Sequence, residues 1–505
     1  MNELLGADTE ALERDAESLS TSSRRVQDLH ILAQRAVGEL QAGWTGSDLR
    51  HLTQQWEQQT SPLLAGVCAS LETCAAQLRA QSAAQRIASG VDGGVHGGSR
   101  VDGGSDRATP PWMTQPAPPP MHGSPAESAS WWRSLSPLQQ ERVLREHPGW
   151  IGNLDGVSPT ARDLANRALL SVDRGFLLAD RERLDAALAT HLATDTLLPD
   201  FRDATMLAQV KDKLASITAI EGTLAQGERQ LLLLDLSQVR AEAAIANGNV
   251  ETADNVAVFV PGMDSNVTDT MKEYDTEMRH LQQRAQQESL RAHPTQASTT
   301  ATVTWIGYQT PQWGFDLLDP DKSVASISTA KDGAAHLVPF LQGIAAGRDH
   351  DAHLTLLGHS YGSTTAGLAM RQQTGVDDAV FFGSPGLGTD RVSDLLLAPG
   401  HPGSGQVSYI EARQEPVGDL GVFGPDPSHL AGIQHASARA STVVDPVTGQ
   451  TRHFDEVTGH VSYLVDNSTS QYNMSVIVAG LPDRQVQDSD EDLGEGLGWS
   501  SRLPL

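Results

Sequence analysis

The fold is decided by the stretch Leu354-Thr355-Leu356-Leu357-Gly358-His359-Ser360-Tyr361-Gly362-Ser363-Thr364-Thr365-Ala366-Gly367. An apolar run, then Gly-x-Ser-x-Gly, then small residues predict a strand, a sharp turn and a helix. Such a turn strains the backbone of Ser360, and strand and helix approach so closely that side chains at positions 358 and 362 would clash. Because both positions are glycine, we predict Ser360 to be an exposed nucleophile. The alternative is a tight structural turn that carries an incidental serine.

A serine hydroxyl is a weak nucleophile that needs a base, and the base needs an acid to orient it. After a strand-to-helix turn of this kind, the chain order is Ser, then Asp or Glu, then His. The apolar run at 407–412 is followed by a loop that carries Glu415 and Asp419, and both are candidates for the acid. His460, in a Gly-preceded loop, is the predicted base. The alternative for His460 is a surface or helix-capping role, and His453 lies in a strand-like run that favours a structural role.

The developing oxyanion of such a reaction needs two backbone N–H donors. The first normally belongs to the residue after the nucleophile, here Tyr361. For the second we predict Met263, because Pro261-Gly262-Met263 follows the strand-like run at 256–260. The alternative is that Pro261-Gly262 forms only a turn.

Strand-like and helical segments alternate on both sides of the Ser360 motif. Short apolar runs bounded by Gly, Pro or Asn occupy residues 231–234, 243–246, 256–260, 302–306, 354–357, 379–382 and 407–410. Helical stretches lie between several of them, at 267–291, 324–346 and 363–372. Runs of this kind are typical of strands buried on both faces, and their alternation with helices predicts an α/β fold with a doubly wound, mostly parallel sheet over residues 228–482.

Four further segments differ in composition from this region. Residues 130–227 read as a helical lead-in, and residues 89–129 as a disordered linker rich in Gly and Pro. Residues 483–505 read as a disordered acidic tail. Residues 1–88 show two amphipathic helical patterns with a break at Gly43-Trp44-Thr45-Gly46-Ser47, which predicts an antiparallel helical hairpin.

The hairpin resembles the WXG family of small helical proteins associated with type VII secretion, because Trp44-Thr45-Gly46 lies at the turn. The resemblance implies a helical protein partner for residues 1–88. The alternative is that Trp44 only covers the hairpin core and Gly46 only supplies the turn. After the second helix the sequence lacks the Tyr followed four residues later by Asp or Glu that such exported proteins often carry.

A second resemblance covers residues 130–480 and rests on six motifs that occur in order. They are Trp131-Trp132-Arg133-Ser134-Leu135-Ser136, Pro148-Gly149-Trp150-Ile151-Gly152-Asn153, Val258-Phe259-Val260-Pro261-Gly262, Trp305-Ile306-Gly307-Tyr308, Gly358-His359-Ser360-Tyr361-Gly362-Ser363 and Phe423-Gly424-Pro425-Asp426-Pro427. This region resembles actinobacterial α/β-hydrolases catalogued as a domain of unknown function. The resemblance implies an α/β-hydrolase fold, a Ser, acid and His triad, and lipase or esterase activity.

Two triad residues, Ser360 and His460, match the pattern of that family directly. The acid departs from it, because members usually carry Asp-Pro-Val where this chain has Glu415-Pro416-Val417. Either Glu415 replaces the aspartate, or Asp419 takes the role.

The charge and the remaining motifs narrow the partners. With 36 Lys plus Arg and 63 Asp plus Glu in 505 residues, the formal charge is 36 − 63 = −27, which disfavours nucleic acids and membrane surfaces. We find no P-loop, no His-Glu-x-x-His and no Gly-x-Gly-x-x-Gly after a strand, so no metal or cofactor is predicted. The two cysteines, Cys68 and Cys74, do not share a helix face and predict no disulfide.

The sequence leads to two functional hypotheses. The first is a serine hydrolase that cleaves a small ester through an acyl-enzyme. The second is a secretion-associated interaction protein whose hydrolase fold is catalytically idle. The acidic N-terminus lacks a cleavable secretory signal, and no apolar run approaches the roughly 18 residues of a membrane span. We therefore expect a cytoplasmic protein, or one exported by a type VII-like route without a cleavable signal peptide.

Overall fold

The computed structural model describes residues 116–120, 123–193, 201–312, 326–398, 400–401, 403–415, 417 and 423–488, with the isolated positions 17, 20, 23 and 27. Apart from those four positions, the predicted WXG-like hairpin, including Trp44, lies outside the described residues, as do most of the linker and tail. The chain divides into two compact units, one of Met1–Ala108 with Ala187–Met206 and one of Thr109–Ala186 with Leu207–Leu505. The second unit carries the sheet and the predicted triad.

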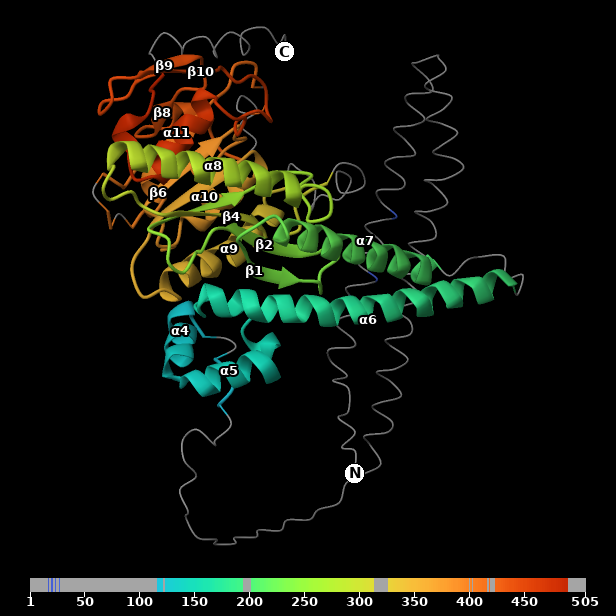
Figure 1. The fold of residues 1–505 in the computed structure, drawn as a ribbon. Helices are drawn as coiled ribbons and strands as arrows, with labels where there is room; N and C mark the ends of the chain where they lie inside the picture. Colours follow the sequence, from blue (N-terminus) through green and yellow to red (C-terminus); the bar gives the residue numbers. More distant parts are fainter. Residues whose placement is uncertain are drawn as a thin grey trace, which may run out of the picture. The chain divides into compact units, whose positions relative to one another are not determined.

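A mostly parallel sheet forms the centre of this unit (Figure 1). Within the described ranges its strand order is β1-β2-β4-β3-β5-β6-β7-β8. The strands are β1 (Arg229–Asp235), β2 (Glu242–Asn247), β3 (Asn255–Val260), β4 (Thr300–Ile306), β5 (His353–His359), β6 (Asp378–Phe382), β7 (Val407–Ile410) and β8 (Gln434–Ala436). β2 runs antiparallel to both β1 and β4, and the pairs from β4 to β8 are parallel. The predicted fold class is confirmed, and every predicted strand run lies in a strand.

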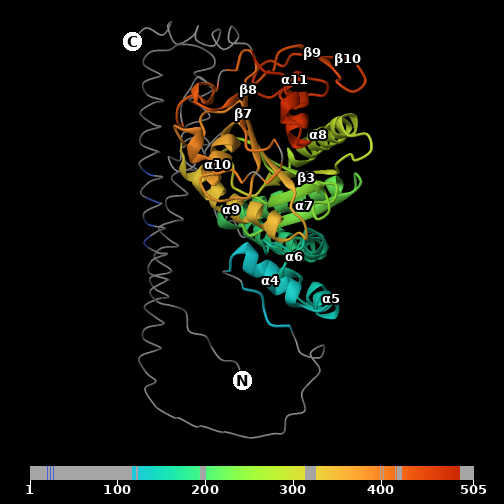
Figure 2. The ribbon, with the colours of Figure 1, turned by 90° about the vertical axis from the view of Figure 1, so that its left-hand side faces the viewer.

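Helices cover both faces of the sheet because its central strands are apolar on both sides. In β3, Val256, Val258 and Val260 pack with α9 (Ser328–Ala346) and α10 (Tyr361–Ala369). Ala257 and Phe259 point the other way, toward α8 (Met271–Ala292) and α11 (Thr469–Val478). Figure 2 shows these helix pairs on opposite sides of the strands. Each fully buried Val, Leu or Phe stabilises the folded chain by about 1.5–3 kcal/mol. The two helical layers therefore hold the strands in place, and with them the loops at the strand ends.

Helices also precede the sheet, in the region predicted as the helical lead-in. They are α4 (Pro125–Ser134), α5 (Pro137–Glu146), the 3₁₀ turn η2 (Pro148–Trp150), α6 (Pro159–Ala193) and α7 (Phe201–Leu224). α4 begins before residue 130, so the predicted linker boundary is wrong. Ser124 caps this helix in a capping box with Glu127, and Pro125 occupies its first turn. These start signals outweigh the Gly and Pro content on which the linker prediction depended.

The C-terminal part adds a two-stranded sheet of β9 (Ser441–Val444) and β10 (Thr451–Phe454), and the 3₁₀ turns η4 (Val392–Asp394), η6 (Pro427–His429) and η7 (Pro482–Arg484). The predicted disordered tail begins too early, because the chain packs through Asp488. Buried Asn473 donates to the carbonyl of Val486 (3.0 Å) and accepts from its N–H (2.7 Å). These two hydrogen bonds satisfy the backbone groups of Val486 and attach this polar segment to α11.

Searched over the described residues, the helices include none with the length and apolar character of a membrane span.

Candidate active site

Ser360 occupies the turn between β5 and α10, where its backbone has φ 51° and ψ −132°. A non-glycine residue rarely adopts this conformation, so the turn is strained as predicted from the motif. A Cβ on Gly358 would lie 2.8 Å from Cα of Ser363, and one on Gly362 would lie 2.2 Å from the carbonyl oxygen of Val260. Both contacts are too short for a side chain. The glycines are therefore needed for close packing of α10 against β5 and β3.

A chain of hydrogen bonds joins the serine, a histidine and a carboxylate from three separate loops. His460 Nε2 lies 2.9 Å from Oγ of Ser360. On the other side of the ring, His460 Nδ1 lies 2.9 and 3.0 Å from the two carboxylate oxygens of Glu415. The Glu415 side chain is buried, and that of His460 is 26% exposed. His460 therefore bridges the buried carboxylate of Glu415 and the hydroxyl of half-buried Ser360.

Glu415 is surrounded by hydrogen-bond donors. Its carboxylate accepts from the N–H of Val417 (2.9 Å) and from the hydroxyl of Tyr463 (2.9 Å), besides His460. Burial raises the pKa of Glu415, but the hydrogen bond and charge of His460 and these two donors outweigh burial, and the net pKa lies below its usual value. Glu415 is therefore ionised at neutral pH. The other predicted acid, Asp419, lies outside the described residues.

The loop that carries His460 is attached to the loop that carries Glu415. Gly459 donates its N–H to the carbonyl of Arg413 (2.9 Å), and Tyr463 accepts from the N–H of Ala412 (3.0 Å) while it donates to Glu415. Both anchors lie in the segment that follows β7. The distance between acid and base is thus set by bonds on either side of His460.

Two backbone segments with the predicted oxyanion donors flank Ser360. Tyr361 is the first residue of α10, and the first N–H groups of a helix have no acceptor within the helix. A Cβ on Gly262 would lie 2.7 Å from Cβ and 3.1 Å from Oγ of Ser360, so the loop after β3 touches the serine. Met263 is the next residue of that loop and is half-buried.

Residues 237–407 match the sequence model of a family described as alpha/beta hydrolase. The chain is also 30% identical over 242 residues to the uncharacterized protein Rv0963c of Mycobacterium tuberculosis, which spans 47% of this chain and 88% of the relative. The chain belongs to this α/β-hydrolase family. A second uncharacterized M. tuberculosis protein, Rv2079, is 31% identical over 319 residues, or 60% of this chain and 45% of its own length.

Among solved structures, this α/β hydrolase matches a hyperthermophilic esterase from the archaeon Pyrobaculum calidifontis at 11% identity and a TM-score of 0.30. The match covers 55% of this chain and 93% of that one. The family assignment rests on the sequence matches and not on this likeness. The mycobacterial relatives agree with the resemblance to actinobacterial hydrolases of unknown function.

Two residues of this hydrolase site were not predicted from the sequence, Tyr463 and His359. The Tyr463 hydroxyl bonds Glu415, and His359 Nε2 lies 2.8 Å from the carbonyl oxygen of His460. His359 stands inside the Gly-x-Ser-x-Gly motif and Tyr463 three residues after the base, so position alone could have drawn attention to both. Neither contact follows from sequence, because each depends on how separate loops pack.

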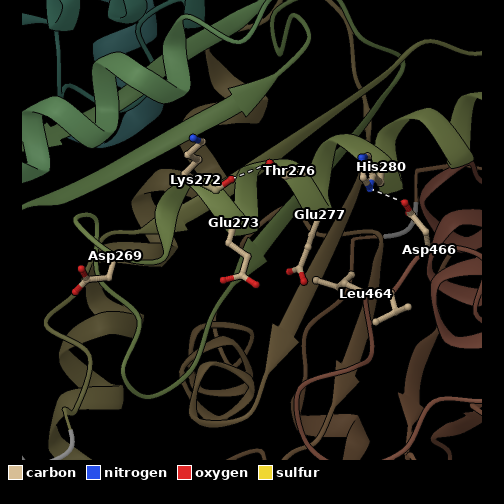
Figure 3. A pocket seen from close by; sticks show the side chains of 9 residues that line it. Asp269, Lys272, Glu273, Thr276, Glu277, His280, Leu464 and Asp466 are labelled. Carbon is tan, nitrogen blue, oxygen red and sulfur yellow. Dashed lines mark hydrogen bonds and ion pairs between the residues drawn. The ribbon is translucent and has the colours of Figure 1, made fainter.

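A groove of about 600 Å³ lies between α8 and residues 464–466 of this hydrolase (Figure 3). Glu273 and Glu277 of α8 line it together with Leu464 and Asp466, whereas Ser360, Glu415 and His460 do not. Burial, with the charges of Glu273 and Asp466, raises the pKa of Glu277 to about 7. Across the described residues, no group of three or more His, Cys, Asp or Glu is arranged to hold a metal ion.

Proposed function

We propose that this chain is a serine hydrolase that cleaves a carboxylic ester through an acyl-enzyme. The observation that carries the proposal is the unbroken series of hydrogen bonds from Ser360 through His460 to Glu415. It stands at a strained strand-to-helix turn of a chain that belongs to an α/β-hydrolase family. Each group has the chemistry its position requires, since a hydroxyl meets a base and the base meets a buried carboxylate.

In the acylation step, Oγ of Ser360 attacks the ester carbonyl carbon while His460 Nε2 takes the hydroxyl proton. A new C–O bond forms, and the carbonyl oxygen becomes an oxyanion. The ionised Glu415 accepts from His460 Nδ1–H and stabilises the imidazolium that results. When the intermediate collapses, the bond to the leaving oxygen breaks, and His460 gives its proton to the departing alcohol.

In the deacylation step, water replaces the alcohol. His460 Nε2 takes a proton from this water as it attacks the acyl carbon, and a second tetrahedral oxyanion forms. Collapse releases the carboxylic acid and returns the proton to Oγ of Ser360. We assign the N–H groups of Tyr361 and Met263 to the oxyanion, because both segments lie against Ser360. A donor of this kind typically stabilises the transition state by about 3–4 kcal/mol.

Covalent labelling of the serine tests this proposal. A fluorophosphonate probe should modify the wild-type chain and leave Ser360→Ala unmodified, while Ser134→Ala, a change at an exposed serine of α4, should label like wild type. A series of p-nitrophenyl esters of increasing acyl length then defines the acyl group that the site accepts. A wild-type chain that does not label, or a Ser360→Ala variant that labels equally, would refute the proposal.

A further inference from the structure

His359 ends β5 directly before the nucleophile, and its ring is enclosed by aromatic rings. It stacks on Phe382 with ring centroids 5.1 Å apart and an interplanar angle of 22°. The ring of His460 lies 4.9 Å away, tilted by 36°, and that of Tyr463 lies 6.0 Å away. A polar ring in such surroundings requires a hydrogen-bond partner.

The partner is the backbone of the base. His359 Nε2 lies 2.8 Å from the carbonyl oxygen of His460. Because a carbonyl oxygen only accepts, Nε2 must carry the proton. Burial lowers the pKa of His359 to about 4, with the neighbouring His460 acting in the same direction, so the imidazole is neutral at pH 7. His359 is therefore a neutral donor with a defined tautomer.

This bond completes the attachment of the His460 loop. The N–H of Gly459 is bonded to Arg413, and the hydroxyl of Tyr463 is bonded to Glu415. Those contacts hold the residues before and after the base, and His359 holds the carbonyl of the base itself. A shift of about 1 Å in a catalytic group can cost roughly 100-fold in rate, so the position of this carbonyl matters for the ring attached to the same residue.

We propose that His359 is a positioning residue, whose Nε2–H holds the His460 backbone and thereby keeps His460 Nε2 within hydrogen-bond distance of Ser360. The kinetic consequence rests on the proposed hydrolase function, whereas the structural consequence does not.

The neutral charge state of His359 also affects the charge that His460 carries in the proposed reaction. The titratable groups near its ring are His460, Glu415 and Tyr463, and Phe382 stacks on it. His460 becomes an imidazolium during the proposed reaction. A neutral ring 4.9 Å away does not oppose that charge, whereas a cationic one would.

His359→Phe is the variant that separates the donor from the ring, because phenylalanine keeps the stacking surface and lacks the N–H. His359→Gln restores a donor at a similar reach. His453→Phe, at an exposed histidine of β10, is the matched control. If His359→Phe does not fold, His359→Met fills the space without a donor and replaces it.

Two measurements on the 505-residue chain test the proposal. In chains labelled with ¹⁵N-histidine, the Nδ1–H resonance of His460 should be the same in wild type and His453→Phe, and should shift or broaden in His359→Phe. The rate of fluorophosphonate labelling should fall about 10- to 100-fold in His359→Phe, with KM for a p-nitrophenyl ester little changed, and should largely recover in His359→Gln.

The two proposals fail in different ways. An unchanged His460 resonance in folded His359→Phe, or its wild-type rate of labelling, would overturn the positioning role. A wild-type chain that does not label, but whose His460 resonance still depends on His359, would remove the hydrolase function and leave the positioning role supported.

Discussion

β5 begins at His353 and ends at His359. Near each of these two ends, a histidine side chain is hydrogen-bonded to a carboxylate. At the amino end, His353 Nε2 lies 2.7 Å from the carboxylate of Asp378. At the carboxyl end, His460 Nδ1 lies 2.9 Å from that of Glu415, beside Ser360. Both carboxylates are buried, but His353 meets one oxygen of Asp378, whereas His460 meets both oxygens of Glu415.

The pairs differ in what the second ring nitrogen meets. His460 Nε2 faces the hydroxyl of Ser360, and the side chain is 26% exposed. His353 is 3% exposed, and within the described residues its Nδ1 has no hydrogen-bond partner. A histidine–carboxylate pair therefore occurs at both ends of the sheet. We expect only the pair whose second ring nitrogen meets a hydroxyl to take part in the proposed reaction.

The largest expected effect follows from removal of the base at the carboxyl end. His460→Ala should lower kcat/KM for a p-nitrophenyl ester by about 10⁴- to 10⁶-fold, because within the described residues His460 is the base hydrogen-bonded to Oγ of Ser360. His453→Ala removes an exposed histidine and should hydrolyse the ester at the wild-type rate. Activity in His460→Ala within tenfold of wild type would show that the carboxyl-end pair is not required for turnover and does not differ from the amino-end pair in this respect.

The acid should have the next largest effect. Glu415→Gln keeps the size of the side chain but removes the charge that stabilises the imidazolium, so kcat should fall by about 10³- to 10⁴-fold. Glu456→Gln, which breaks an ion pair with Arg413 at 3.7 Å, is the control and should leave kcat unchanged. Wild-type turnover in Glu415→Gln would show that a carboxylate outside the described residues, such as Asp419, supplies the charge.

The same variant has a pH signature in stability. Because folding lowers the pKa of Glu415, its ionised form stabilises the folded chain above the ordinary carboxyl pKa, and this contribution is lost as the pH falls through the lowered value. The difference in Tm between wild type and Glu415→Gln should shrink on acidification.

An intermediate effect is expected where backbone lies against the acid and the base. A Cβ on Gly383 would lie 3.0 Å from Oε2 of Glu415 and 3.1 Å from Nδ1 of His460, and its φ is 55°. Gly383→Ala should lower kcat about 10- to 100-fold through displacement of the pair. Gly375→Ala imposes similar backbone strain at φ 81°, but its Cβ meets only Ala345 at 3.8 Å, so kcat should remain at the wild-type value. Equal losses of kcat in both variants would assign the effect to strain.

Much of the carboxyl-end site could be predicted because its signals are local. Gly358 and Gly362 mark the turn through their own steric demands, and the apolar runs mark the strands that place loops at one edge of the sheet. Parallel strands bring loops far apart in the sequence to one edge of the sheet, and the strand-to-helix serine motif indicates that an acid and then His460 follow Ser360 along the chain.

The remaining features depend on contacts between distant segments. Glu415 and Asp419 could not be separated by sequence, because the choice depends on which carboxylate reaches Nδ1 of His460. The order of the tail through Asp488 depends on buried Asn473, and β8 has only three residues and no distinctive pattern. For the same reason, the sequence distinguishes neither His353 from His359 nor a structural pair from a catalytic one.

The smallest expected effect on turnover concerns the amino-end pair. His353→Leu removes the donor to Asp378, whose other oxygen accepts from the N–H groups of Gly405 and Gln406 at 2.9 and 2.7 Å. The unpaired oxygen should lower the free energy of unfolding by about 1–3 kcal/mol, measured by chemical denaturation, while kcat at 25 °C stays at the wild-type value.

His401→Leu is the matched test at the same edge. His401 Nδ1 lies 3.3 Å from Asp377 and the side chain is 30% exposed, so water can replace its hydrogen bond and the loss of stability should be at most about 1 kcal/mol. If His353→Leu lowered kcat without lowering stability, the amino end of β5 would be coupled to the chemistry. In that case burial of His353 Nδ1 would not be enough to mark the His353–Asp378 pair as structural, and the contrast with the His460–Glu415 pair would be wrong.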